Sequence, residues 1–232
     1  MGKTALAMNI AEAVAIRSKF PVLFVSLEMS EAELGDRLLC SLARVNSHRL
    51  RNGTLSADDR KRLVEKAGEV SESPFYVDDS PSRSVSEIAA AARRIIRRER
   101  RLGLIIIDYL QLIEPDNMRD PRQEQVARIA RRLKGLARDL ETPVLCLAQL
   151  NRQAEDSRDH RPRLSHLRES GAIEQDADIV MFIHREEYYQ HGEVDEETAG
   201  KAEIIIAKQR NGPVGVAELG WEKEYTRFYD RA

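Results

Sequence analysis

The chain opens on the segment that most constrains its fold, Gly-Lys-Thr at residues 2–4, followed at once by a predicted helix over residues 5–16. Gly-Lys-Thr is the closing half of the phosphate-binding motif G-x-x-x-x-G-K-[ST], in which the lysine contacts phosphate oxygens and the threonine hydroxyl binds Mg²⁺. The N-terminus of a helix, with its free N–H groups, is where a polyphosphate rests. Because so short a motif also begins ordinary solvated helices by chance, its interpretation depends on the rest of the chain.

The size and charge of the chain exclude several classes of protein. At 232 residues it is long enough for one large α/β domain or two small ones. Its 37 Lys and Arg residues nearly balance its 39 Asp and Glu residues, so nucleic-acid binding would require a local basic patch. We find no apolar run long enough to cross a membrane. The two cysteines, Cys40 and Cys146, lack metal-ligand spacing and predict buried thiols in a reducing, cytoplasmic compartment.

Strand predictions place acidic and polar residues at the ends of apolar runs. The run over residues 20–28 ends at Glu28, and the run over residues 102–108 ends at Asp108. In open α/β sheets the carboxyl ends of the strands line the ligand crevice. An acid in the position of Asp108 holds Mg²⁺ in phosphate-loop enzymes. Glu28 could orient or deprotonate a water there, or else belong to the cap of the next helix, where Ser30 and Glu33 form a capping-box signal.

A further predicted strand, residues 143–149, ends at Gln149, a polar residue that could sense a γ-phosphate. Helical patterns separate the predicted strands along the chain. This alternation indicates a mostly parallel sheet with right-handed connections. The helices are expected at residues 31–45, 56–71, 88–101 and 121–141.

The last third of the chain carries two candidate contact segments. Arg168, Ser170 and Gly171 stand at the head of a short predicted helix, where they could hold the phosphates of a single strand or form an ordinary surface loop. Further on, the strand over residues 202–207 leads to a turn, and Lys208 and Arg210 are expected to lie exposed at the tip of a hairpin. Two exposed cations at the tip of a hairpin resemble an arginine finger, a cationic side chain that reaches into a phosphoryl-transfer site. Edge strands are expected at residues 214–218 and 225–229.

Taken together, these segments resemble one family. The motifs that carry the resemblance are Met-Gly-Lys-Thr at residues 1–4, Ser-Leu-Glu-Met-Ser at 26–30, Ile-Asp-Tyr-Leu-Gln-Leu at 107–112, Leu-Ala-Gln-Leu-Asn-Arg at 147–152, Arg-Glu-Ser-Gly at 168–171 with Asp-Ala-Asp at 176–178, and Lys-Gln-Arg-Asn-Gly-Pro at 208–213. They occur in the order found in the C-terminal RecA-like motor domain of bacterial DnaB-type replicative DNA helicases. The resemblance covers essentially the whole chain and implies a single domain, residues 1–232. The implied fold is a phosphate-loop ATPase core with a central, mostly parallel, twisted sheet, flanking helices and a C-terminal antiparallel hairpin.

The resemblance also implies a role for each matching residue. Gly2, Lys3 and Thr4 would hold ATP and Mg²⁺, with Asp108 as the strand-end acid. Glu28 would polarise the attacking water, Gln149 would report on the γ-phosphate, and Arg37 would pack on the adenine. Lys208 and Arg210 would reach into the site of the neighbouring subunit. Contacts with the DNA backbone, independent of base sequence and weakened by salt, are implied for Arg168, Glu169 and Gly171.

The implied protein is an ATP-hydrolysing helicase, a homo-hexameric ring that translocates on single-stranded DNA at the replication fork and works with a helicase loader and a primase. Relative to that family, we expect this sequence to lack the N-terminal collar domain, the linker helix and the first half of the phosphate loop. Two alternatives remain open. One is a ring or DNA-binding module without turnover, and the other is a RecA-type recombinase, against which the Arg-Glu-Ser-Gly and Lys-Gln-Arg segments stand.

Overall fold

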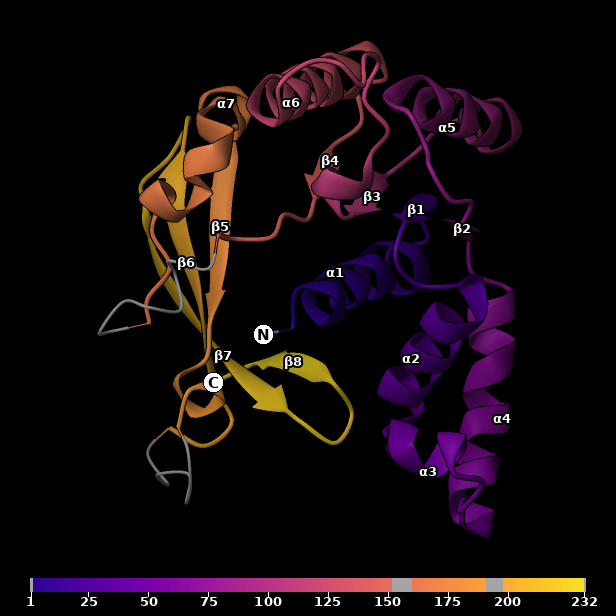
Figure 1. The fold of residues 1–232 in the computed structure, drawn as a ribbon. Helices are drawn as coiled ribbons and strands as arrows, with labels where there is room; N and C mark the ends of the chain where they lie inside the picture. The colour runs from indigo at the N-terminus through magenta and orange to yellow at the C-terminus, as the bar shows by residue number, and fades with distance from the viewer. Residues whose placement is uncertain (1, 152–159, 191–197, 232) are drawn as a thin grey trace.

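The computed structural model describes residues 2–151, 160–190 and 198–231, and Figure 1 shows their arrangement. Arg152, the last residue of the Leu-Ala-Gln-Leu-Asn-Arg motif, lies outside the described residues. The helices are α1 Lys3–Glu12, α2 Glu31–Ala43, α3 Ser47–Arg51, α4 Ala57–Ser71, α5 Val85–Glu99, α6 Arg122–Asp139 and α7 Gly171–Asp176. The strands are β1 Val22–Ser26, β2 Phe75–Asp78, β3 Leu104–Asp108, β4 Val144–Cys146, β5 Ile179–His184, β6 Lys201–Gln209, β7 Gly215–Glu222 and β8 Arg227–Asp230.

A parallel sheet with the strand order β2-β1-β3-β4 forms the centre of the molecule. Its two middle strands, β1 and β3, are buried along their whole length, as expected for apolar runs covered on both faces. Alternate side chains of these strands pack against α5 and α6 on one face and against α1 and α2 on the other. The pairing of Ser26 with Asp108 brings the ends of β1 and β3 together.

The antiparallel part of the fold is larger than the sequence predicts. Instead of a hairpin attached to one sheet, the structure has a second sheet of four strands, in the order β5-β6-β7-β8. The long hairpin of β6 and β7 is extended on both sides, because β5 pairs antiparallel with β6 and β8 pairs antiparallel with β7. The second sheet packs through Trp221 and Phe228 against the first turns of α1, at Ala5 and Leu6.

The helix starts follow the sequence signals closely. Capping boxes, in which a serine and an acid three residues later satisfy each other's backbone N–H groups, begin α2, α4 and α5. The segment between α2 and α4 is itself partly helical, because the side chain of Asn46 caps the five-residue helix α3. A π-helical turn, Ala13–Arg17, extends α1 before β1.

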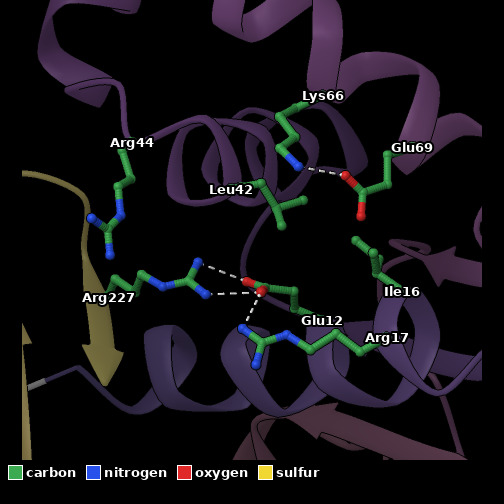
Figure 2. A pocket seen from close by; sticks show the side chains of 8 residues that line it. All are labelled: Glu12, Ile16, Arg17, Leu42, Arg44, Lys66, Glu69 and Arg227. Carbon is green, nitrogen blue, oxygen red and sulfur yellow. Dashed lines mark hydrogen bonds and ion pairs between the residues drawn. The ribbon is translucent and has the colours of Figure 1, made fainter. Parts of the chain in front are cut away.

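An ion pair between α1 and β8 fixes the far end of the helix that begins with the phosphate motif. Arg227 donates to both carboxylate oxygens of Glu12 at 2.9 Å, and Arg17 donates to the same carboxylate at 3.0 Å. Figure 2 shows these contacts in a small pocket whose opposite wall carries the Lys66–Glu69 pair. Glu12 is only 2% exposed, so the buried carboxylate depends on Arg227 for its charge compensation.

Both cysteines are free thiols, and burial raises the pKa of Cys40 to about 11 and that of Cys146 to about 12. Neither side chain is therefore a reactive thiolate at neutral pH. No helix in the described part of the chain is long and apolar enough to span a bilayer.

Candidate active site

The phosphate motif lies at the N-terminus of α1, beside the second sheet. Gly2 adopts a left-handed conformation with φ 100°, and its carbonyl accepts the first helical hydrogen bond, from Leu6, at 3.0 Å. A Cβ atom at this position would lie 3.1 Å from the ring of Phe228. Glycine is therefore required here both by the backbone conformation and by the approach of β8.

The first turn of α1 contacts the end of β3 through one short hydrogen bond. The hydroxyl of Thr4 donates to Oδ2 of Asp108 at 2.7 Å. Asp108 is only 2% exposed. Burial raises the pKa of its carboxyl group and the nearby charge of Glu28 adds to this, while the Thr4 hydrogen bond and the charges of Lys3 and Arg37 act in the opposite direction. The structure therefore places the strand-end acid in contact with the phosphate motif.

Lys3 is half-buried and faces the same acids. Loss of solvent lowers the pKa of its ammonium group, and the charges of Asp108 and Glu28 oppose this effect. Its Nζ also lies 5.8 Å from the centre of the Tyr109 ring. The ammonium group of Lys3 is partly shielded from water and lies near two acids. It is therefore suited to bind the phosphate oxygens of a polyphosphate that binds as its Mg²⁺ complex.

Glu28 stands in the turn that follows β1, beside Asp108. The backbone N–H of Leu27 donates to the carbonyl of Asp108 at 2.8 Å, and the side chain of Ser26 closes the turn through Met29. Glu28 itself is exposed. The cap of α2 uses Ser30 and Glu33, so the capping alternative for Glu28 does not hold.

Gln149 follows β4, beyond the end of the strand as the structure defines it. The side chain of Gln111 brackets its peptide group, since Gln111 Nε2 donates to the carbonyl of Gln149 at 3.1 Å and Gln111 Oε1 accepts from its N–H at 3.3 Å. These contacts continue the β3–β4 pairing past the last strand residue. Gln111 belongs to the Ile-Asp-Tyr-Leu-Gln-Leu motif at residues 107–112. The sequence of that motif does not indicate that the Gln111 side chain reaches Gln149.

The described residues suit a Mg²⁺ ion bound together with a nucleotide. Mg²⁺ prefers oxygen ligands and is held in such sites by one or two protein groups, phosphate oxygens and water. Thr4 and Asp108 present a hydroxyl and a carboxylate oxygen in contact. Within the described residues no cluster of three or more His, Cys, Asp or Glu side chains could hold a metal by itself. Arg37, on α2, is exposed, and its charge reaches Asp108.

The segment expected to contact DNA lies elsewhere, packed against β5 of the second sheet and against α6. Arg168 and Glu169 belong to the 3₁₀ segment Leu164–Ser170, and their side chains lie outside the described residues. Gly171 is exposed and begins α7. The segment is anchored by Leu167, which packs on Val180 and Phe182 of β5. Below, residues 168–171 are called loop 168–171.

The expectation that Lys208 and Arg210 both lie exposed at a hairpin tip is wrong for Lys208. Arg210 is exposed at the start of the β6–β7 turn, but Lys208 lies within β6 and is half-buried. Its ammonium group donates to the backbone carbonyls of Glu174, Gln175 and Ala177 of its own chain. The sequence shows the hairpin but not this contact, because α7 and β6 are distant in the chain.

A parallel α/β core in which the phosphate-motif threonine binds a strand-end aspartate, with the motif lysine close by, is typical of phosphate-loop ATPase domains. Within that class the chain belongs to the DnaB-like helicase C terminal domain family, whose model matches residues 1–230.

Named relatives and solved structures agree with this assignment. The chain is 48% identical over 229 residues to the replicative DNA helicase DnaB of Geobacillus stearothermophilus, covering 98% of this chain and 50% of that protein. It is 48% identical over 231 residues to the replicative DNA helicase DnaC of Bacillus subtilis, again covering 98% and 50%. The chain thus spans about half the length of the curated relatives it matches.

Among solved structures, one described as an ATPase domain superposes with a TM-score of 0.95 at 38% identity, covering 100% of this chain and 81% of that one. A DnaB-like replicative helicase, described together with its interactions with primase, superposes with a TM-score of 0.94 at 37% identity, covering 100% and 55%.

Proposed function

We propose that this chain is the ATP-hydrolysing motor domain of a replicative DNA helicase that works as a homo-hexameric ring on single-stranded DNA. The observation that carries the proposal is the contact between Thr4 and Asp108, with the half-buried Lys3 beside it. This arrangement places a cation and two Mg²⁺-compatible oxygens at the start of a helix, where a triphosphate is held in phosphate-loop enzymes.

Each step of hydrolysis then has a residue assigned to it. Gly2, Lys3 and Thr4 bind the phosphates, and a bound Mg²⁺ would be held by Thr4 and Asp108 and would neutralise developing charge on the phosphate oxygens. Glu28 orients and polarises the attacking water. Following the family resemblance, we assign sensing of the γ-phosphate to the side chain of Gln149 and packing on the adenine to the side chain of Arg37.

DNA binding is assigned to Arg168, Glu169 and Gly171. The support is their place in loop 168–171, which is anchored to β5 through Leu167 and is separate from the nucleotide site. Contacts of this kind to the phosphate backbone are independent of base sequence and weaken as salt is added. Arg210, and with it Lys208, is assigned to the nucleotide site of the neighbouring subunit, so that hydrolysis requires the ring.

The partners of the proposed ring are a helicase loader and a primase at the replication fork in the cytoplasm. Support for the primase comes from the DnaB-like neighbour, whose structure is described with its interactions with primase. Hydrolysis in the ring would drive translocation along one strand and separation of the duplex ahead of it.

The test is ATP hydrolysis by the full-length protein that contains this chain, with and without single-stranded oligo(dT), and with Lys3→Ala as the matched inactive variant. We expect turnover that oligo(dT) accelerates and that Lys3→Ala abolishes. Absence of Lys3-dependent turnover under ring-forming conditions would instead support a ring or DNA-binding module without hydrolysis. Strand exchange without unwinding would support the recombinase alternative.

A further inference from the structure

The side chain of Lys208 ends against the last turn of α7. Its Nζ donates to the backbone carbonyls of Glu174, Gln175 and Ala177, at 3.2 Å for Gln175 and 2.8 Å for Ala177. A lysine ammonium group has three N–H donors. All of them are therefore occupied by α7 in this arrangement, and none is left for a phosphate.

Arg210 and Asp178 strengthen the same connection. Arg210 Nη2 donates to the carbonyl of Gln175 at 2.7 Å, and its backbone N–H donates to the carbonyl of Asp178 at 2.9 Å. The carboxylate of Asp178 lies 3.7 Å from Arg210 Nε and also binds Lys134 of α6. The end of α7 is thus held from β6 on one side and from α6 on the other.

These contacts matter because α7 has little stability of its own. It has only six residues, far fewer than an isolated helix needs in water. The last carbonyls of any helix lack partners within it, and cations at that end satisfy them and interact favourably with the helix dipole. Lys208 supplies hydrogen bonds of the stronger, charge-assisted kind to these carbonyls.

The helix that Lys208 holds begins at Gly171, two residues after Glu169. Loop 168–171 is therefore fixed at two places, by Leu167 before it and by the end of α7 after it. Loss of the second anchor leaves the loop backbone free to shift, and small shifts of binding groups cost large factors in affinity or rate.

We propose that Lys208 is a positioning residue for loop 168–171 of its own subunit, acting through the last turn of α7. The proposal rests on the proposed function in taking loop 168–171 as the DNA contact. Since the donors of Lys208 are fully used by α7, engagement of this side chain with the neighbouring nucleotide and engagement with α7 exclude each other. A subunit whose Lys208 turns to its neighbour thereby loosens its own grip on the strand.

The first experiment uses the nucleotide-free full-length protein, in which no neighbouring phosphate is present for Lys208 to contact. Hydrogen–deuterium exchange of peptides covering residues 171–178 is compared between the parent, Lys208→Met and Lys201→Met. Lys201 is the matched control, because it is an exposed lysine at the other end of β6. We expect exchange about tenfold faster in Lys208→Met, as for the loss of one or two charge-assisted hydrogen bonds, and no change in Lys201→Met.

The second experiment measures the affinity of the same proteins for fluorescent oligo(dT) with a non-hydrolysable ATP analogue. Lys208→Met should bind about tenfold more weakly than Lys201→Met, and Lys208→Arg, which keeps the charge and several donors, should recover most of the loss. If Lys208→Met does not fold by circular dichroism, Lys208→Ala, which also lacks a side-chain N–H donor, replaces it in both experiments.

Two results would overturn the proposal. Unchanged exchange over residues 171–178 in the Lys208 variants would show that the side chain does not hold α7. Faster exchange with unchanged oligo(dT) affinity would show that α7 does not position the DNA contact. Failure of the proposed function is a separate result, since it appears in the parent protein as turnover that oligo(dT) does not accelerate, whatever the exchange of α7.

Discussion

The hydroxyl of Thr4 donates a 2.7 Å hydrogen bond to the carboxylate of Asp108, across 104 residues of sequence. This contact joins the first turn of α1 to the carboxyl end of β3. It brings the two oxygens that would hold Mg²⁺ into contact, at the cost of placing an acid where it is 2% exposed. The contact therefore positions both oxygens for Mg²⁺, but burial disfavours the ionised form of Asp108 when no cation is bound to it.

Asp108→Asn should lower activity and raise stability. Turnover should fall by at least about tenfold, because a group that holds or orients a metal is lost. The pKa of Asp108 is raised in the native state, so between its ordinary pKa and this raised pKa the native state binds more protons than the unfolded state. The free energy of unfolding therefore falls as the pH rises through that window. Asparagine does not ionise, so the variant avoids this decrease.

The measurement is urea unfolding without Mg²⁺ at pH 7 and at the acid limit of the folded range. The free energy of unfolding of Asp108→Asn should exceed that of the parent at pH 7, and the difference should shrink at acid pH. A variant less stable than the parent at pH 7 would mean that the Thr4 hydrogen bond outweighs the burial of the charge.

Much of this site could be predicted from the sequence, because its residues follow short apolar runs or begin a helix. Asp108 ends β3 as expected, and Glu28 stands two residues beyond the end of β1. The parallel pairing of Ser26 with Asp108 brings the two acids near each other. The phosphate motif begins α1 as expected. Such features depend on local periodicity and on the geometry of parallel sheets, both of which are readable from a single chain.

Features that depend on contacts between distant side chains could not be predicted. The reach of Lys208 to α7 and the bracketing of Gln149 by Gln111 both join elements whose distance is set by tertiary packing. The sequence also leaves β5 out of the second sheet for a related reason, since its antiparallel pairing with β6 is a contact between separate segments of the chain. The roles given to Arg37, Arg168 and Glu169 stay predictions.

Glu28→Gln should leave nucleotide binding close to that of the parent and reduce turnover by about a hundredfold or more, as for loss of a general base. The reason is that Glu28 is exposed beside Asp108 and takes no part in the cap of α2. Binding of a fluorescent ATP analogue and steady-state hydrolysis separate the two effects. Glu31→Gln is the control, and normal turnover in Glu28→Gln would remove Glu28 from its proposed role.

Gln111→Ala should reduce turnover by about tenfold, because two hydrogen bonds of roughly 0.5–1.5 kcal/mol each that orient the Gln149 peptide are lost. The double variant with Gln149→Ala should be no slower than Gln149→Ala alone, since both changes act on one group. Gln123→Ala, an exposed glutamine on α6, is the control. Additive losses in the double variant would show that Gln111 acts independently of Gln149.

Arg227→Met should destabilise the domain by about 3–5 kcal/mol, because it leaves the buried carboxylate of Glu12 with only Arg17 as a partner. The substitution Arg17→Met should lower the free energy of unfolding by less than about 1 kcal/mol, because the side chain of Arg17 is 65% exposed. Urea unfolding gives both values. The double variant Glu12→Leu, Arg227→Met should recover most of the loss, and failure to recover would assign the effect of Arg227 to its contacts with Ser41 instead.

Arg210→Ala tests whether the ring shares its active sites between subunits. An arginine that completes a neighbouring phosphoryl-transfer site contributes a factor of about 10³ or more, so the uniform variant should be nearly inactive. A Lys3→Ala subunit has a defective phosphate site but an intact Arg210. In mixed rings an Arg210→Ala subunit beside a Lys3→Ala subunit gains a complete site, and part of the rate should return as the mixing ratio approaches equality. If every mixture stays as inactive as its two parents while ring formation is intact, Arg210 serves its own subunit, where it already holds Gln175 and Asp178.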